Sequence, residues 1–457
     1  MIRFRCFLLI CCIAFSCCLG GCTAEAPPPA PRPEAVRDEG RPVPPDRPGR
    51  WNPLRDRGGP AGMTELGEEM ARLEAIGYVS GSREAGGSSG VTIHDLDRAG
   101  GGTNLYASGH GPEAVLMTMD GTLIHRWRCS SREIWPDADE PFVPKGGRRG
   151  KGKAKKMADS GEDTDFFRMV HLYPNGDLLA IFEGRGIVRM DRYSTLLWAS
   201  RCGAHHDLDI LPDGDLLVLT REARINPLVS DDKPILEDFI TTLDAEDGRV
   251  KDRVSLVECF NNAPQFEAIW RSSENESGDI FHTNALFLLG EPAAGLPASF
   301  LAGRVLTSMR ALNCVALVDL DDRSVVWAAT GRFRGQHDPR LLASGRLLLF
   351  DNYGVTNRSR VLEMDLDTWR PVWSYKGTSE APFYSETCGT AQRLGNGNTL
   401  ITESDGGRAF EVTTDGTIVW EFWSPHRAGG DGQFIATLFA VTRLDPAFPV
   451  HWAGGAP

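Results

Sequence analysis

The sequence lacks the closely spaced cysteines on which zinc sites and disulfide frameworks are built. Six of its 11 cysteines fall within the first 22 residues, and the other five are Cys129, Cys202, Cys259, Cys314 and Cys388. These five are far apart and odd in number, and none forms a C-x-x-C pair, so the body of the protein shows neither a zinc motif nor a disulfide pattern. We expect most of them to be small buried apolar residues.

Positive charge and nucleotide-binding loops are also scarce. The chain has 49 Lys and Arg residues against 62 Asp and Glu residues, a net charge of −13, which argues against nucleic acid as a partner. No P-loop and no glycine-rich nucleotide fingerprint occurs, so we predict no nucleotide cofactor and assign no other cofactor.

Turn formers and apolar residues are abundant. The 457 residues are 41% hydrophobic and include 50 glycines, 29 prolines and 11 tryptophans. A chain of this length can bury a large core, and the composition is typical of many-stranded β folds.

The N-terminus has the pattern of an export signal. Arg3 and Arg5 precede an apolar run that closes with Leu19-Gly20-Gly21-Cys22, and this run is too short to span a membrane. Residues 1–22 resemble a bacterial lipoprotein signal peptide, in which Cys22 becomes the lipidated first residue. The alternative is an ordinary secretory signal. We therefore expect an exported body in the periplasm or cell envelope, anchored to a membrane by the lipid on Cys22.

Three segments differ in composition from the body. Residues 23–62 are rich in Pro, Arg, Asp and Glu, which predicts a disordered linker that acts as a tether. Residues 63–82 carry apolar side chains three and four positions apart, which predicts a short amphipathic helix. Residues 145–165 are first basic and then acidic, which predicts a solvated low-complexity insertion.

A strand, a tight turn and a second strand recur along the body. The copies are HLYPNGDLLAIFEG, HHDLDILPDGDLLVLTR, GQHDPRLLASGRLLLFDN and GTAQRLGNGNTLITES, which start at His171, His205, Gly335 and Gly389. Turn residues between two apolar runs predict a β-hairpin.

Tryptophans mark the end of a longer repeat. They close apolar strands at Trp127, Trp198, Trp327, Trp373 and Trp420, and the last three lie 46 and 47 residues apart. A period in the mid-forties with about four strands per unit is typical of propeller blades. TTLDAEDGRVKDRVSL has the turn but no Trp and supplies a sixth blade. The sequence therefore predicts an all-β fold, a six-bladed β-propeller over residues 91–445, with the run from Phe434 closing the ring.

Three histidines share one register of these repeats. His206, His282 and His337 each lie eight residues before a glycine, at Gly214, Gly290 and Gly345. Because equivalent positions of successive blades converge on one axis, these histidines predict a central site. When the insertion 290–302 is left out, Arg310 follows His282 by 15 residues, as Arg221 follows His206.

Three histidines and an arginine around one channel allow three interpretations. Imidazoles suit zinc or copper, although no short-range ligand spacing is present. Each His-Asp pair could instead cap a strand end. In the third interpretation, one neutral imidazole is a nucleophile toward a sulfuryl or phosphoryl group, and the other histidines and the arginine neutralise its oxygens.

Several of these motifs resemble a known family. They are HHDLDILPDGDLLVL, DIFHTN, GQHDPRLLASGRLLLFDN with RSRVLEMDLDTWRPVWSY, and GTAQRLGNGNTLITES with RAFEVTTDGTIVWEF. Together they are similar to the bacterial arylsulfotransferases, the PAPS-independent aryl sulfate:phenol enzymes, over roughly residues 205–425. Members of that family are six-bladed propellers. The resemblance implies that His337 is transiently sulfurylated, that His206, His282 and Arg310 hold the sulfuryl oxygens, and that the group passes from a phenolic sulfate to a phenol.

The sequence also departs from that family. The interval between His282 and Arg310 is longer than the family pattern, so Arg304 and Arg221 are fallback ligands for the sulfuryl group. No segment corresponds to the N-terminal β-domain through which better-known members form dimers, and the oligomeric state stays open. Candidates for contact with the substrate ring are Phe281, Trp327, Phe333, Tyr353 and Tyr384.

Two other functions fit parts of the pattern. A lipid-anchored propeller that serves as a binding or envelope-assembly scaffold would show the same Trp-closed repeats, but it would not require histidines in one register of three blades. The runs DAEDGRV and DGTIVW resemble the repeat of quinone-dependent dehydrogenases, which six blades and an axis of histidines fit poorly.

Overall fold

Short apolar runs, separated by turns that contain Gly, Asn and Asp, form antiparallel strands throughout the structure. The computed structural model describes residues 80–136, 165–271, 276–291, 295–354, 358–429 and 431–455, together with Leu66, Glu69, Met70 and Leu73. All of these residues lie in the unit Pro42–Pro457. Within them, the strands form six sheets of four or five strands and one sheet of three. We name the six larger sheets blades 1 to 6.

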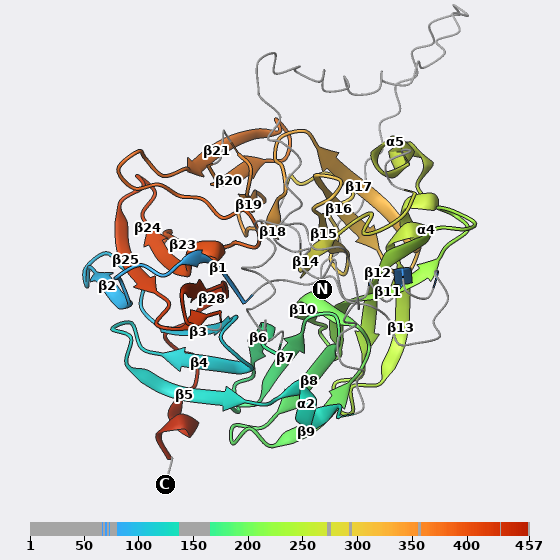
Figure 1. The fold of residues 1–457 in the computed structure, drawn as a ribbon. Helices are drawn as coiled ribbons and strands as arrows, with labels where there is room; N and C mark the ends of the chain where they lie inside the picture. The colour runs from blue at the N-terminus through green and yellow to red at the C-terminus, as the bar shows by residue number, and fades with distance from the viewer. Residues whose placement is uncertain are drawn as a thin grey trace, which may run out of the picture. The chain divides into compact units, whose positions relative to one another are not determined.

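Each blade is a meander whose first strand lies at the centre of a ring of sheets (Figure 1). Blade 1 contains β28 (Leu438–Leu444), β3 (Thr103–Ser108), β4 (Glu113–Met117) and β5 (Leu123–Arg128). Blade 2 contains β6 (Phe167–Leu172), β7 (Leu178–Phe182), β8 (Gly186–Met190) and β9 (Leu196–Ser200). Blade 3 contains β10 (Ala204–Ile210), β11 (Leu216–Ile225), β12 (Pro234–Leu243) and β13 (Val250–Ser255).

The second half of the ring has the same order of strands. Blade 4 contains β14 (Thr283–Leu288), β15 (Val305–Met309), β16 (Cys314–Asp319) and β17 (Ser324–Thr330). Blade 5 contains β18 (His337–Leu341), β19 (Leu347–Asp351), β20 (Arg360–Asp365) and β21 (Arg370–Tyr375). Blade 6 contains β22 (Thr390–Arg393), β23 (Thr399–Glu403), β24 (Arg408–Val412) and β25 (Ile418–Trp423), with β2 (Gly90–His94) outside β25.

The inner strands pack side by side around the whole ring, in the order β28, β6, β10, β14, β18, β22 and back to β28. The ring closes because β28, from the C-terminal end, pairs with β3, with Leu444 opposite Thr103. The prediction of an all-β propeller closed by a C-terminal strand is confirmed. Two details differ: the closing strand begins at Leu438 instead of Phe434, and β2 joins blade 6 instead of opening blade 1.

The hydrophobic core is divided among the interfaces between blades. Six clusters of buried apolar residues each combine side chains of two adjacent blades. Both faces of the inner and middle strands are therefore covered, which explains why strands such as β7 (LLAIF) read as continuous apolar runs.

Four of the repeated tryptophans link their blade to the next one by a hydrogen bond. Trp127 of β5 donates its indole N–H to Gly176 O in blade 2, and Trp198 of β9 donates to Ala245 O in blade 3. Trp373 and Trp420 make the same kind of contact in blades 5 and 6. A tryptophan at the rim thus both fills the interface and satisfies a backbone carbonyl, which is a physical reason for its recurrence.

Several shorter elements lie outside the strands of the six blades. β1 (Gly81–Glu84), β27 (Phe434–Ala436) and β26 (Arg427–Ala428) form the three-stranded sheet. The remaining helices are α2 (Ser131–Ile134), α4 (Leu256–Asn261), η1 (Pro264–Phe266), α5 (Glu267–Trp270), η2 (Ser404–Gly406) and η3 (His451–Gly455). The predicted helix 63–82 extends too far, because Gly81 and Ser82 belong to β1. A Cβ on Gly81 would lie 2.5 Å from Ile435 O, so this residue packs too closely on β27 for any side chain.

Several predictions fall outside the described residues. These are the signal peptide 1–22 with Cys22, the linker 23–62, the insertion 145–165 except Asp165, and most of the helix 63–82, of which Leu66, Glu69, Met70 and Leu73 are helical. Among the helices that the structure describes, none combines the length and the apolar character needed to cross a membrane. Of the five cysteines in the body, all of which are free thiols, Cys259, Cys314 and Cys388 are buried.

Candidate active site

The predicted histidines and Arg310 meet at the inner ends of blades 3, 4 and 5. His206 lies near the start of β10, His282 directly precedes β14, His337 opens β18, and Arg310 follows β15. The three histidines are 3%, 4% and 2% exposed, respectively. The rings of His206 and His282 lie edge to face with their centres 5.3 Å apart, and the charges of Arg310 and His282 both act on His337. The structure therefore brings the four predicted residues together.

Two carboxylates hold the backbone at His206 and His282. Both histidines adopt the left-handed conformation, with φ of 54° and 49°, which is uncommon for a residue with a side chain. Glu183 Oε2 accepts a hydrogen bond from His206 N at 3.2 Å, and Asp279 Oδ1 accepts one from His282 N at 3.0 Å. Each carboxylate therefore stabilises the left-handed backbone conformation at its histidine.

The protonation pattern of His337 follows from its hydrogen bonds. His337 Nδ1 lies 2.8 Å from Asn352 Oδ1 and 3.0 Å from Gly335 O. The orientation of the Asn352 amide is fixed because its Nδ2 donates to the carbonyls of Ser385 and Cys388 at 3.0 and 2.7 Å. Both neighbours of Nδ1 are thus acceptors, so Nδ1 carries the proton and Nε2 carries a lone pair. Nε2 is buried and has no hydrogen-bond partner among the described residues.

The surroundings also keep His337 neutral. Burial and then the charge of Arg310 lower the pKa of His337 well below its usual value, and Arg168 and His282 act in the same direction. The hydrogen bond that His337 Nδ1 donates to Asn352 opposes this shift without reversing it. At neutral pH the ring is therefore an uncharged imidazole with its lone pair available, the form that a nucleophile requires.

His282 is paired with a buried carboxylate. Its Nδ1 lies 2.5 Å from Asp279 Oδ2, which directs the other ring nitrogen, Nε2, away from Asp279. Burial raises the pKa of Asp279, but the charge and hydrogen bonds of His282 outweigh burial, so the pKa lies below its usual value. Burial and the charge of Asp279 raise the pKa of the neighbouring Asp238. Asp279 thus keeps the negative charge of this pair of carboxyl groups, and Asp238 takes up a proton more readily.

His206 belongs to a network that the sequence did not reveal. Its Nδ1 lies 2.7 Å from Nδ1 of the adjacent His205 and 3.5 Å from Glu183 Oε1. Arg168 and Arg221 both approach Glu183, at 3.8 and 3.3 Å. Burial, followed by the charge of Arg168, lowers the pKa of His206 well below its usual value. The neutral ring offers hydrogen bonding, and the positive charge on this side of the site comes from the arginines.

The fallback arginines differ in position from Arg310. Arg310 NH2 donates to the hydroxyl of Tyr353 at 3.0 Å. Arg221, at the equivalent point of blade 3, pairs with Glu183. The prediction that Arg304 could be a ligand of the sulfuryl group is wrong. Arg304 precedes β15, at the opposite end of the strand from Arg310, and pairs there with Asp319 at 3.0 Å.

The register argument needs one correction. The hairpin of blade 4 closes between Leu289 and Arg304, with Gly303 in the turn, so Gly303 takes the place that we gave to Gly290. When residues are counted back from Leu289, where this hairpin closes, Asn284 occupies the position that His337 has in blade 5, and His282 lies two residues earlier. His282 nevertheless reaches the axis, as its contact with His206 shows.

Sequence reasoning missed Asn352, although a signal was present. Asn352 follows His337 by 15 residues, the same interval that separates His206 from Arg221. The position at the end of the second strand thus carries Arg221, Arg310 or Asn352 in three successive blades. Asp279 and Glu183 gave no comparable signal, because acidic residues are common in the turns of this chain.

The candidate aromatic residues divide into two groups. Tyr353 contacts Arg310, and Tyr384 is near enough to Tyr353 for the two hydroxyl groups to influence each other. The other three lie in the core: Phe281 packs on Phe260 and Trp270, Trp327 packs on Phe300 and Trp369, and Phe333 packs on Trp369. Only the two tyrosines remain candidates for contact with a substrate ring.

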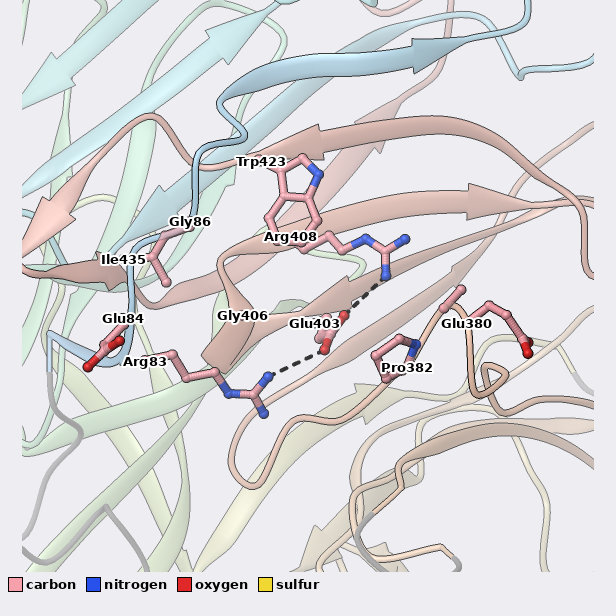
Figure 2. Close-up of a pocket in the computed structure, with 11 residues that line it drawn as sticks. Arg83, Glu84, Gly86, Glu380, Pro382, Glu403, Gly406, Arg408, Trp423 and Ile435 are labelled. Carbon is pink, nitrogen blue, oxygen red and sulfur yellow. Dashed lines mark hydrogen bonds and ion pairs between the residues drawn. The ribbon is translucent and has the colours of Figure 1, made fainter.

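A pocket of about 470 Å³ opens beside blade 6, between the three-stranded sheet and the loop around Pro382 (Figure 2). Arg83 and Arg408 both pair with Glu403, at 3.6 and 3.4 Å. Trp423 and Pro382 add apolar walls. Glu403 also accepts a hydrogen bond from Tyr384 N, which connects the pocket to the tyrosines near the axis. The pocket lies at the same end of the strands as the histidines.

A metal ion was one interpretation of the axial histidines. Among the described residues at the axis, Glu183, His205 and His206 form a group whose donor atoms all lie within 4.8 Å of one another. His282 and His337 do not belong to this group. Arg168 and Arg221 beside Glu183 place two positive charges where a cation would bind. The arrangement therefore favours an anion over a metal ion at the axis.

The chain is similar to a protein family and to several solved structures. A family model described as arylsulfotransferase (ASST) matches residues 171–425, more than half of the chain. No curated protein matches the chain. Similar solved structures include a protein of unknown function from Bacteroides caccae, with 13% identity, a TM-score of 0.44, and coverage of 74% of this chain and 98% of that chain. A streptogramin B lyase has 11% identity, a TM-score of 0.39, and coverage of 79% and 95%. These similarities concern the fold alone.

Proposed function

Because the chain belongs to the arylsulfotransferase family, we propose that it transfers a sulfuryl group from a phenolic sulfate ester to a phenol, without a nucleotide donor and with His337 as the nucleophile. The observation that carries the proposal is the state of His337. Its Nδ1 is committed to Asn352 and Gly335, and its buried Nε2 has no partner among the described residues. The surrounding arginines attract the anionic donor.

The first half-reaction forms one bond and breaks another. The lone pair of His337 Nε2 attacks sulfur, the bond between sulfur and the phenolic oxygen breaks, and the electron pair leaves with that oxygen. Arg310 and His206 bind the oxygens of the sulfuryl group and offset their charge. His282 enters this step with a proton on each ring nitrogen; Asp279 accepts the hydrogen bond from Nδ1, and Nε2 gives its proton to the departing phenolate, which leaves His282 neutral.

The second half-reaction reverses these steps with another phenol. His282 takes the proton of the acceptor, whose oxygen attacks sulfur. The bond between His337 Nε2 and sulfur breaks, and its electron pair returns to the imidazole. Since the donor and the acceptor use the same groups in opposite directions, the reaction follows a ping-pong course.

The location of the reaction is part of the proposal. The pattern of residues 1–22 supports an exported protein with a lipid on Cys22, held at a membrane in the cell envelope by the linker 23–62. Phenols and their sulfate esters would then be exchanged outside the cytoplasm, where no nucleotide-activated sulfate is required.

The test uses the chain without residues 1–22 and follows 4-nitrophenolate release from 4-nitrophenyl sulfate, with phenol as acceptor. We expect acceptor-dependent release that vanishes in His337→Ala and persists in a matched control, His451→Ala, because His451 is exposed and far from the axis in η3. Equal rates for both variants would refute the role of His337. Absence of release from a folded protein with a range of aryl sulfates would favour a binding scaffold.

A further inference from the structure

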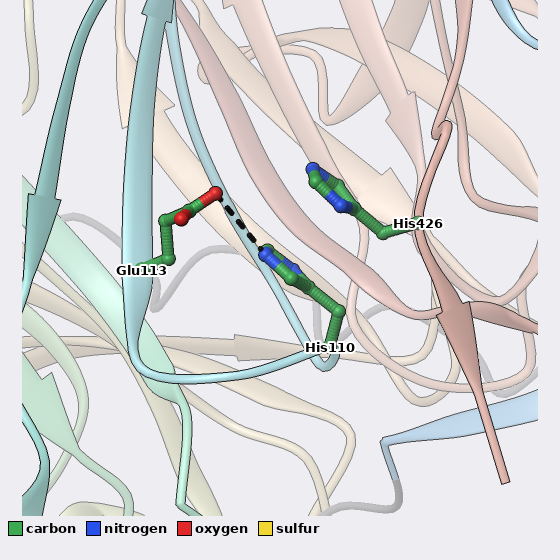
Figure 3. A group of neighbouring side chains, drawn as sticks. All are labelled: His110, Glu113 and His426. Carbon is green, nitrogen blue, oxygen red and sulfur yellow. Dashed lines mark hydrogen bonds and ion pairs between the residues drawn. The ribbon is translucent and has the colours of Figure 1, made fainter.

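A second cluster of chemically active side chains lies where the first and last blades meet. His110 is in the turn between β3 and β4, Glu113 opens β4, and His426 follows β25 (Figure 3). The two imidazole rings are stacked, with centres 3.6 Å apart and planes within 6°. One donor atom from each of the three residues lies within 4.8 Å of the other two. None of these residues takes part in the proposed sulfuryl transfer.

Polar partners hold all three side chains in place. Ser108 Oγ lies 2.6 Å from His110 Nδ1, and Tyr106 OH lies 3.1 Å from His426 Nε2. His110 Nε2 lies 3.3 Å from Glu113 Oε1. The other carboxylate oxygen of Glu113 accepts a hydrogen bond from Arg128. Such outer contacts fix ring planes and leave one donor atom of each residue for a shared ligand, as they do around protein-bound metal ions.

The donor set defines the class of ion. Two imidazole nitrogens and one carboxylate oxygen suit zinc and its neighbours among the divalent transition metals better than calcium or magnesium, which prefer oxygen ligands. Zinc binds these atoms at about 2.0–2.2 Å and in the plane of each imidazole ring, so the stacked rings of His110 and His426 have to tilt out of their parallel arrangement to share one ion. His110 and His426 are only half-buried, which leaves room for water at a fourth position.

The nearby arginines do not close the site to a cation. Arg126 and Arg128 approach Glu113, but 42% and 65% of their side chains are exposed. Water and salt screen exposed charges strongly. By contrast, Arg168 and Arg221 beside the axial Glu183 have side chains that are only 6% and 4% exposed. The arginine charges near Glu113 are therefore screened more strongly than those near Glu183, so they oppose a cation less at this cluster than at the axis.

We propose that His110, Glu113 and His426 bind one zinc-class divalent cation that joins blade 6 to blade 1. His110 and Glu113 belong to blade 1, and His426 leaves the last strand of blade 6. The ion would therefore strengthen the junction at which the ring closes, a structural role that is independent of the proposed catalysis.

The experiment uses the whole chain as expressed, stripped of metal with a chelator and then titrated with ZnCl₂ in a calorimeter. We expect one equivalent of zinc to bind to the parent protein and to be lost in His426→Gln and in Glu113→Gln. The matched control is His94→Gln, which removes a partly exposed histidine in β2 outside the cluster and should leave the equivalent intact.

Thermal unfolding with and without zinc supplies a second measurement. Zinc should raise the melting temperature of the parent protein and of His94→Gln, because an ion that binds only the folded state stabilises it. It should leave those of His426→Gln and Glu113→Gln unchanged. Loss of the equivalent in Glu183→Gln, with retention in His426→Gln, would assign the ion to the axis and overturn the proposal. Absence of stoichiometric binding by the folded parent protein would overturn it as well.

Discussion

Replacement of Asp279 by Asn should separate the acid–base role of His282 from its role in binding charge. The change keeps the volume of the side chain but removes the negative charge that lies 2.5 Å from His282 Nδ1. An amide can present either oxygen or N–H to the ring, so the variant no longer forces the proton onto Nδ1. His282 then loses the carboxylate that stabilises its doubly protonated form, from which Nε2 donates to the leaving group.

The magnitude follows from the type of bond that is lost. A hydrogen bond to a charged group contributes about 1.5–3 kcal/mol. Each 1.36 kcal/mol of barrier changes the rate about tenfold, so we expect kcat to fall about ten- to hundred-fold. Asp279 contacts the Nδ1 side of His282 and has no role in binding the donor in the proposed reaction, so KM should change little.

The assay compares donors whose phenols differ in pKa. Without acid assistance, the rate of Asp279→Asn should depend more steeply on the pKa of the leaving phenol than the rate of the parent enzyme does. The control is Asp238→Asn in the same buried pair. Since burial and Asp279 already raise the pKa of Asp238, a neutral amide resembles its protonated form and should retain most activity. A folded Asp279→Asn variant with the parent's rate and the parent's leaving-group dependence would refute this account of His282.

Three further predictions concern other parts of the molecule. Asn352→Ala removes one of the two acceptors at His337 Nδ1 and the amide that donates to the carbonyls of Ser385 and Cys388. We expect the free energy of unfolding, measured with denaturant, to fall by about 1–3 kcal/mol, and kcat of the folded variant to fall as well. Because the folded-state pKa of Asp238 is raised above 3.8, folding stability should decrease as the pH rises from about 4 through that folded-state pKa. Melting curves at several pH values should show this slope in the parent and a weaker slope in Asp238→Asn. Finally, Cys22→Ala should move the protein from the membrane to the soluble fraction after cell fractionation, and retention at the membrane would contradict a lipid anchor at Cys22.

The fold was predictable because its main signals are local. A hairpin needs a turn of Gly, Asn or Asp between two apolar runs. The tryptophans recur because they fill the interfaces between blades, where Trp127, Trp198, Trp373 and Trp420 also donate a hydrogen bond to the next blade. The division of the C-terminal run between two sheets, where the ring closes, was harder to predict. FIATLFAVTRL reads as one strand, but Phe434–Ala436 pairs with β1 while Leu438–Leu444 pairs with β3. Two partners far away in the sequence decide this division.

The insertion between blades 3 and 4 gave no clear signal either. Ser255 ends β13 and caps α4, because its side chain accepts a hydrogen bond from Glu258 N in the first turn of that helix. Cys259, Phe260 and Trp270 then add to the core between blades 3 and 4. Helices of four and six residues carry too little periodicity to be recognised in a sequence.

The candidate site was predictable in its histidines and not in their partners. Register along the repeats located His206 and His337 on the axis, whereas His282 lies two residues before the equivalent position. Register also does not say which acceptor meets each ring nitrogen. The proton on His337 depends on Asn352, whose amide is oriented by two carbonyls of the following loop. That arrangement is a property of the assembled ring, since it joins the end of β19 to residues that precede β22.

In the sequence, the His-Asp pairs could be interpreted either as strand caps or as parts of an anion site, and the structure supports both roles at once. In blade 3, His206 faces the axial network, while Asp207 accepts a hydrogen bond from Leu286 N of blade 4 at 2.9 Å. In blade 5, His337 is the candidate nucleophile, while Asp338 accepts one from Ala391 N of blade 6 at 2.9 Å. In each pair, the aspartate therefore satisfies a buried backbone N–H on the inner strand of the next blade, while the histidine contributes to the site. The aspartates that hold neighbouring blades together are thus covalently adjacent to the histidines, so correct closure of the ring also sets the geometry at the axis.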